Sequence, residues 1–153
     1  MTERTLVLIK PDGVQRLLVG RILERYEQRG LKIVGLKLVA VSRDLAEQHY
    51  AIHRDKPFFK GLVDFITSSP LVALALEGNN AIALCRSITG ATRPIDAAPG
   101  SIRGDFAIEV GQNLVHASDS AENAQTELAL WFADSELHTY ERAVDEWVVG
   151  PRG

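Results

Sequence analysis

The chain has 153 residues, of which 46% are hydrophobic and 24% charged, and its formal net charge at pH 7 is -3. This length allows one hydrophobic core, so we expect a single domain over residues 1–153, and the composition excludes disordered and collagen-like proteins. The slightly acidic balance argues against a protein that binds nucleic acid through a broad basic face.

The apolar segments of the chain are short. Four consecutive apolar residues precede Lys10, too few for the core of a signal peptide. The longest uncharged apolar stretch, Leu71 to Leu76, is far shorter than a membrane span. The lone cysteine, Cys85, has no intrachain partner, lies in an apolar run and is expected to pack there. We therefore expect a cytoplasmic protein that uses no membrane.

The first third of the chain predicts two strands and a helix. Thr5 to Ile9 is a short apolar run that predicts a buried strand, and turn-forming residues end it at 10–13. Apolar residues four apart over 18–26 predict an amphipathic helix, with Gly30 as its C-terminal cap. Leu31 to Val41 predicts the second strand.

The middle third predicts a helical hairpin, a strand and a helix. Ser42 to His53 is expected to be helical with Ser42 as its cap, and helical spacing resumes after Pro57. Leu71 to Leu76 predicts a central strand that ends at Glu77 and Gly78. The next helix would bury Ile82, Cys85 and Ile88 and would begin at Asn79 or Asn80.

The last third predicts a long loop, a strand and a helix. Gly90 to Gly111 is rich in Gly, Pro and Ala without periodicity, and such loops usually belong to a site. Asn113 to His116 predicts a fourth strand, and the helix after it, capped by Asp119 or Ser120, places Leu128, Trp131 and Phe132 on its core side. The order predicts an α+β fold, a ferredoxin-like split β-α-β sandwich whose four-stranded antiparallel sheet is covered by helices, expected on one face.

The histidines are the first candidates for chemistry. His116 lies between an apolar pair and small polar residues at a junction between strand and helix. Neutral imidazole is a good nucleophile, although one histidine in a sequence is more often a packed or surface residue. His49 and His53, four residues apart, could be two metal ligands on one helical face, but no third ligand pattern accompanies them.

Three cations are the second set of candidates. Lys10 ends a buried strand, Arg86 lies in an apolar helix and Arg103 stands in the glycine-rich loop. Partly buried cations require an anion, and a polyphosphate would serve because guanidinium groups bind phosphate oxygens in pairs. Scattered surface salt bridges would explain the same residues equally well.

Seven segments, in the same chain order, resemble signatures of the nucleoside diphosphate kinase family. The resemblance covers about Thr5 to Phe132, so we expect a core over about 4–132 and a C-terminal extension over 133–153. The segments are Thr5 to Gly13, Gln48 to Tyr50, Lys56 to Phe59, Phe65 to Pro70, Gly90 to Thr92, Ala98 to Phe106, and Asn113 to His116 with Ser118 and Asp119.

The resemblance implies roles for particular residues. His116 would be phosphorylated on Nδ1, and Glu127 would hold its other ring nitrogen and fix its tautomer. The other implied catalytic residues are Lys10, Tyr50 and Ser118. The implied nucleotide-binding residues are Lys10, Phe58, Leu62, Arg86, Thr92, Arg103 and Asn113. Stacking on Phe58 would accept purines and pyrimidines alike, although Phe58 and Tyr50 could each simply be packing residues.

The resemblance also implies an activity and its cofactor. The chain would transfer the γ-phosphoryl group of a nucleoside triphosphate, mainly ATP, to a nucleoside diphosphate by a ping-pong mechanism. Mg²⁺ would be held mainly through nucleotide phosphates, with no dedicated protein ligands. The implied partners are these nucleotides and further copies of the chain, with a homohexamer favoured and a tetramer or dimer possible.

Two positions depart from the family pattern. Ala117 follows the histidine where glycine is usual, which is harmless if its backbone φ is negative and costly if φ is positive. Ser69 also replaces a usual glycine. The extension has enough apolar residues to pack rather than dangle, and we expect it to wrap over a protomer surface. These are Leu137, Tyr140, Val144, Trp147 and Val148.

Two other classes of protein compete with the kinase. A ferredoxin-like module could bind anionic metabolites through Lys10 and the arginines, with His116 merely structural. A scaffold protein would leave the clustered cations and the long Gly90 to Gly111 loop unexplained.

Overall fold

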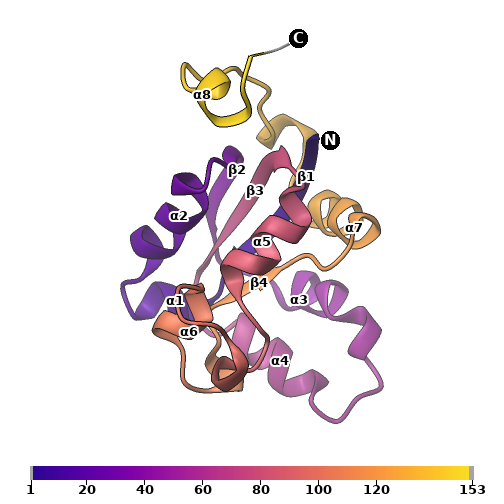
Figure 1. Ribbon diagram of the computed structural model, residues 1–153. Coiled ribbons are helices and arrows are strands. Elements are labelled where there is room, and N and C mark those ends of the chain that lie inside the picture. Colours follow the sequence, from indigo (N-terminus) through magenta and orange to yellow (C-terminus); the bar gives the residue numbers. More distant parts are fainter. Residues whose placement is uncertain (1, 152–153) are drawn as a thin grey trace.

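A four-stranded antiparallel sheet forms the centre of the computed structural model, which describes residues 2–151 (Figure 1). The strand order is β2-β3-β1-β4. The inner strands are β1 (Thr2–Ile9) and β3 (Leu71–Asn79), and the edge strands are β2 (Lys32–Val39) and β4 (Val115–Ala117). All neighbouring strands pair antiparallel. The predicted α+β fold is confirmed.

The helices alternate with these strands along the chain. The α-helices are α1 (Pro11–Gln15), α2 (Val19–Gln28), α3 (Arg43–His49), α4 (Phe59–Ile66), α5 (Ala81–Thr89), α6 (Ile102–Phe106), α7 (Ala121–Trp131) and α8 (Asp145–Val149). Short 3-10 turns lie at Ala51–His53, Pro94–Asp96, Val110–Gln112 and Asp134–Glu136. Within residues 2–151, no helix is long and apolar enough to cross a membrane.

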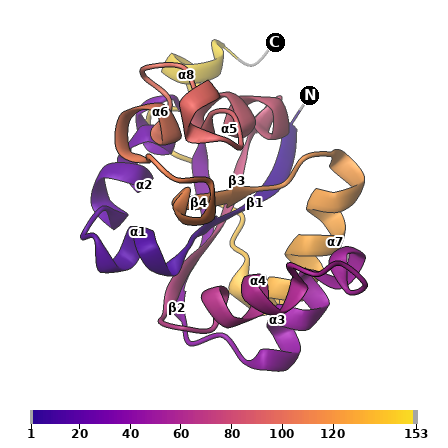
Figure 2. The ribbon, with the colours of Figure 1, turned by 90° about the horizontal axis from the view of Figure 1, so that it is seen from below.

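Helices cover both faces of the sheet, so the expectation of one covered face is wrong. Figure 2 shows α2 and α5 on one side of the strands and α3, α4 and α7 on the other. Val7 and Ile9 of β1 face the first group, and Leu6 and Leu8 face the second. The cause is visible in β1, whose uninterrupted apolar residues are buried on both sides.

Side-chain caps begin two helices beside the site. The Ser42 hydroxyl accepts a hydrogen bond from the Leu45 amide at the start of α3, and Ser120 does the same for Asn123 at the start of α7. Of the two residues proposed to cap α7, Ser120 is therefore the cap. Asn80 occupies the corresponding position before α5, but its side chain makes no cap bond.

Two segments expected to be irregular contain short helices. Pro11 occupies the first turn of α1, where its missing amide hydrogen costs nothing, so the predicted turn after β1 is helical. Within the loop from Gly90 to Gly111, Ser101 accepts a hydrogen bond from the Gly104 amide and begins α6. This short helix matters for the site because it carries Arg103.

The C-terminal segment packs against the β2 edge of the sheet only in part. Leu137 packs against the core, and the His138 amide donates to the Val34 carbonyl at 2.8 Å. The Tyr140 hydroxyl donates to the Ile33 carbonyl. In contrast, Trp147 on α8 is 86% exposed, so the expectation that it packs is wrong for the single chain.

Candidate active site

A cavity of about 580 Å³ opens at one end of the sheet, within the size range of small-ligand sites. The α3–α4 hairpin, α5, the loop from Gly90 to Gly111 and strand β4 contribute its walls. The structure brings together all the predicted nucleotide-binding residues and three of the predicted catalytic ones, because Lys10 belongs to both sets. The lining includes Lys10, Tyr50, Phe58, Leu62, Arg86, Thr92, Arg103, Asn113 and His116.

The cavity wall combines exposed apolar groups with cations, of which Arg103 is buried. Phe58 is 49% and Val110 54% exposed, and both present apolar surface to the cavity. Arg103 is only 4% exposed, and Lys10 is half-buried. A ligand with a flat apolar end and an anionic end matches this distribution.

Strand β4 aims His116 at helix α7. His116 lies opposite Leu8 in the β1–β4 pairing, and Leu8 belongs to the face that α3 and α7 cover. There the His116 Nε2 atom lies 2.9 Å from Glu127 Oε1. Ser118 donates its hydroxyl to the same oxygen at 2.6 Å. These three of the five predicted catalytic residues therefore form one hydrogen-bonded group.

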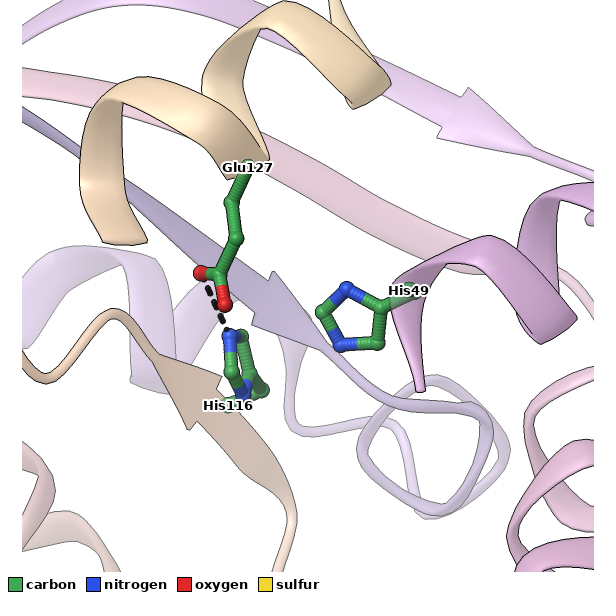
Figure 3. A group of neighbouring side chains, drawn as sticks. All are labelled: His49, His116 and Glu127. Atoms are coloured by element: carbon green, nitrogen blue, oxygen red, sulfur yellow. Dashed lines mark hydrogen bonds and ion pairs between the residues drawn. The ribbon is translucent and has the colours of Figure 1, made fainter. Parts of the chain in front are cut away.

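Glu127 fixes the tautomer of His116. Burial alone would raise the pKa of Glu127, but the hydrogen bonds from His116 and Ser118 outweigh it and hold the pKa below its usual value. The charged carboxylate accepts a hydrogen from Nε2, which leaves the lone pair of a neutral ring on Nδ1. Figure 3 shows that nitrogen pointing away from Glu127.

Arg103 braces the segment that leads into β4. Its guanidinium donates to three backbone carbonyls, those of Gly90, Asn113 and Val115. Five N–H groups are available on a guanidinium, so two remain for a ligand. Burial lowers the pKa of Arg103 to about 10, which leaves it charged near neutral pH. The same side chain can therefore hold the backbone and offer positive charge to the cavity.

Lys10, which follows β1, and Asp12 in α1 hold the same segment. The Asp12 carboxylate accepts the amide of Leu114, whose φ of 73° is unusual for a residue with a side chain. Lys10 donates its backbone amide to the Leu114 carbonyl and its ammonium to Asn113 Oδ1 at 2.5 Å. The Asn113 side chain in turn donates to the Thr92 carbonyl.

Burial also weakens the charge on Lys10. Loss of solvent lowers its pKa to about 8, Asp12 opposes this shift, and Arg103 adds to it. Lys10 is therefore charged at neutral pH and loses its proton as the pH rises through about 8.

Arg86 is exposed on α5, and its guanidinium donates to the Ala117 carbonyl at 3.1 Å.

Two uncharged rings lie near His116: His49 packs against it, and Tyr50 packs against His49. The rings of His49 and His116 meet edge to face with 4.7 Å between centroids. Burial, followed by the neighbouring His116, lowers the pKa of His49 to about 3. Burial, together with the nearby Glu127, raises the pKa of Tyr50 to about 12. Both side chains are therefore uncharged over the whole physiological range.

The possible metal ligands His49 and His53 do not belong to a common group of three or more candidate ligands among residues 2–151. His49 instead groups with His116 and Glu127, and the ligand atoms of the three lie within 4.8 Å of one another. His53 lines the cavity and packs against Phe58 at 5.3 Å between ring centroids. The third ligand of the group comes from α7, far along the chain, so local spacing could not indicate it.

Sequence reasoning missed several residues that shape the site. Asp12 lies in the segment from Thr5 to Gly13 that resembles the family. The sequence alone does not indicate that its carboxylate contacts the Leu114 amide. Trp131 was assigned to the core, and its indole also donates to His49 at 3.1 Å. Phe65 and Val110 line the cavity as further apolar groups, and the Lys10 ammonium lies 5.8 Å from the centre of the Phe65 ring.

Both departures from the family pattern are accommodated. Neither Ala117 nor Ser69 has a positive φ, so a side chain causes no backbone strain at either position. The Ala117 methyl packs in the core beneath α5, and the Ser69 hydroxyl accepts a hydrogen bond from Gln15.

Comparisons with known proteins point to one family. Residues 3–137 match the family model for nucleoside diphosphate kinase. The nucleoside diphosphate kinase of Picosynechococcus is 57% identical over 95% of this chain and 98% of its own length, and that of Archaeoglobus fulgidus is 54% identical over 98% and 99%. The solved structure of a halophilic nucleoside diphosphate kinase from Halobacterium salinarum in complex with CDP has a TM-score of 0.94, with 49% identity over 97% of this chain and 99% of that one.

Replacing Ala117 with glycine tests whether its methyl group serves only packing. Ala117→Gly should lower the free energy of unfolding by about 1 to 2 kcal/mol, because a buried methyl is lost and the backbone gains freedom. Denaturant unfolding measures this loss, and the exposed Ala133→Gly should lose less. A tenfold or greater fall in catalytic rate for Ala117→Gly would contradict a purely structural role.

Proposed function

The chain belongs to the nucleoside diphosphate kinase family, and on this premise we propose that His116 carries the phosphoryl group between nucleotides. The family assigns the enzyme class, a transferase that moves a γ-phosphoryl group from a nucleoside triphosphate to a nucleoside diphosphate. The observation that supports His116 is its hydrogen bond to Glu127 beside a cation-lined cavity. The non-catalytic binding module and the scaffold have no comparable support.

In the first half-reaction, the Nδ1 lone pair attacks the γ-phosphorus of the triphosphate. A nitrogen–phosphorus bond forms, the bond to the bridging oxygen breaks, and the nucleoside diphosphate leaves with that electron pair. In the second half-reaction, a β-phosphate oxygen of another diphosphate attacks the phosphorus, and the electrons return to Nδ1. Glu127 stabilises the positive charge that develops on the ring while the phosphoryl group is attached.

The cations around the cavity supply the complementary charge. We propose that Lys10, Arg86 and the two unused N–H groups of Arg103 bind the oxygens of the phosphoryl group during its transfer. Tyr50 keeps its hydroxyl hydrogen because its pKa is raised, so it can donate beside His116. Thr92 and Asn113 lie where they can contact phosphate or ribose hydroxyls. Groups that are already in place need no reorganisation during transfer.

The exposed apolar residues would hold the base. Phe58 and Leu62 present an aromatic face and an aliphatic side chain to the cavity, and neither reads hydrogen-bonding edges. Broad tolerance of purines and pyrimidines follows. The related Halobacterium structure was solved in complex with CDP, which supports a pyrimidine nucleotide as one ligand.

Mg²⁺ is the proposed cofactor, carried in by the nucleotide. The described residues that line the cavity include cations and hydroxyl groups but no carboxylate. This donor set suits a magnesium ion that is bound through phosphate oxygens and water. When bound, the ion neutralises phosphate charge.

Self-association is proposed with a homohexamer favoured over a tetramer or dimer. Apolar side chains on the loop from Gly90 to Gly111 are strongly exposed, with Ile95 at 80% and Ile108 at 86%. Edge strand β2 exposes Leu36 and Leu38 in addition. Such residues favour contact with other chains.

We also propose that residues 1–153 act as one domain in the cytoplasm, where the buried free thiol of Cys85 would stay reduced.

Covalent labelling tests the nucleophile. The protein is incubated with γ-labelled ATP and Mg²⁺ without an acceptor, and the stability of the label is then measured. We expect a label that acid removes and alkali does not, as for phosphohistidine, and any nucleoside diphosphate should discharge it. His116→Asn should take up none, whereas His138→Asn, an exposed histidine outside the site, should label like the wild type. Equal labelling of His116→Asn would exclude His116, and an unlabelled wild type would exclude the mechanism.

The pKa of Lys10 predicts an alkaline limit to activity. Above about pH 8 the ammonium loses its proton, so the free enzyme should bind phosphates less well and kcat/KM should fall. The fall should be weaker in kcat, because bound phosphate favours the charged lysine. With ATP and CDP as substrates, Lys10→Arg should show no fall in kcat/KM near pH 8, whatever its absolute rate, because arginine keeps its charge there. If kcat/KM of Lys10→Arg falls at the same pH, a group other than Lys10 causes the fall.

Light scattering tests the proposed assembly. We expect a mass near six times that of one chain, and Ile108→Glu should shift the population to smaller species because it places a charge in an apolar contact. A monomeric wild type would contradict self-association.

A further inference from the structure

His49, His116 and Glu127 have the composition of a metal site. Their ligand atoms lie within 4.8 Å of one another, and all three residues are partly buried (Figure 3). Two imidazoles and one carboxylate are a familiar ligand set of catalytic zinc sites. A zinc ion bound there would occupy the ring and the carboxylate that the phosphotransfer uses.

Trp131 decides what His49 can do in this group. Its indole Nε1–H donates to His49 Nδ1 at 3.1 Å. An indole nitrogen can only donate, so Nδ1 must keep its lone pair for this bond. A neutral imidazole then carries its hydrogen on Nε2. One ring nitrogen of His49 is therefore occupied and the other has no lone pair, so neither is available to a metal ion.

The surroundings keep His49 in this form. Trp131, the last residue of α7, is 2% exposed and packs in the core together with Ala46 of α3. The His49 ring meets the rings of Tyr50 and His116 edge to face, and the centroid distance is 4.7 Å in both pairs. Turning the ring, or moving its hydrogen to Nδ1, would leave a buried indole N–H unpaired, at a cost of about 1–3 kcal/mol.

We propose that Trp131 and His49 act together as positioning residues that deny His116 and Glu127 a third metal ligand. His49 fills the side of the His116 ring beside Glu127 with an uncharged side chain that neither binds zinc nor exchanges its tautomer. The importance for catalysis rests on the proposed function, because a metal on this group would remove the nucleophile. The tautomer itself does not depend on that function.

Nitrogen NMR tests the tautomer directly. In wild-type protein labelled with ¹⁵N in its histidines, His49 should show a protonated Nε2 and an unprotonated Nδ1, unchanged from about pH 5 to about pH 9. The hydrogen of Trp131 Nε1 should show a coupling or exchange protection typical of a hydrogen-bonded donor. A protonated Nδ1 on His49, or a mixture of tautomers, would overturn the proposal without any variant.

Zinc binding tests the consequence. Calorimetry on nucleotide-free protein would compare the wild type with Trp131→Phe, which keeps an aromatic ring and removes the donor. Trp147→Phe, the same substitution at the exposed tryptophan on α8, is the matched control. We expect Trp131→Phe to bind Zn²⁺ about tenfold or more tightly than the wild type and the control, in line with the effect of orienting partners on metal affinity.

A double variant assigns the gained affinity to His49. Trp131→Phe with His49→Asn should lose the gain, because the third ligand is absent. Equal zinc affinity of the wild type and a folded Trp131→Phe would overturn the proposal, as would a gain that survives in the double variant. These binding measurements use no nucleotide, so a wild type that binds little zinc but takes up no phosphate would contradict the proposed function and leave this inference standing.

Discussion

The hydrogen bond between His116 Nε2 and Glu127 is the interaction on which the site depends. Without it, an imidazole can carry its hydrogen on either nitrogen and can turn about its side-chain bonds. The charged carboxylate selects one tautomer and one orientation, and Ser118 holds the carboxylate by donating to the same oxygen. The fold meets this requirement by placing β4 and α7 next to each other, so that the two residues meet across the covered face of the sheet.

The cations of the site are also structural groups. Arg103 donates three of its N–H groups to backbone carbonyls, and the Lys10 ammonium donates to the Asn113 side chain. These bonds fix the segment that enters β4 and give both positive charges polar partners within the chain. Burial lowers the pKa of Lys10 to about 8, so the proposed role of Lys10 in binding phosphate requires a pH below that value.

The strands, most helices and the set of residues that meet at the cavity could be predicted because their signals are local or belong to motifs. The analogy with a ferredoxin-like sheet led to the wrong prediction that helices cover one face. The unbroken apolar run of β1 is typical of a strand that is buried on both faces. Contacts such as Trp131 with His49, or Asp12 with Leu114, join residues far apart in sequence. No spacing rule reports which polar atoms of two distant segments will meet, so these contacts require the structure.

The position of the phosphoryl group on the ring tests the central claim most directly. Phosphorus and nitrogen NMR of the ¹⁵N-labelled phosphoenzyme would show which nitrogen of His116 is bonded to phosphorus. If Glu127 sets the tautomer, phosphorus is bonded to Nδ1 and Nε2 keeps its hydrogen. Phosphorus bonded to Nε2, or to any other residue, would contradict the account.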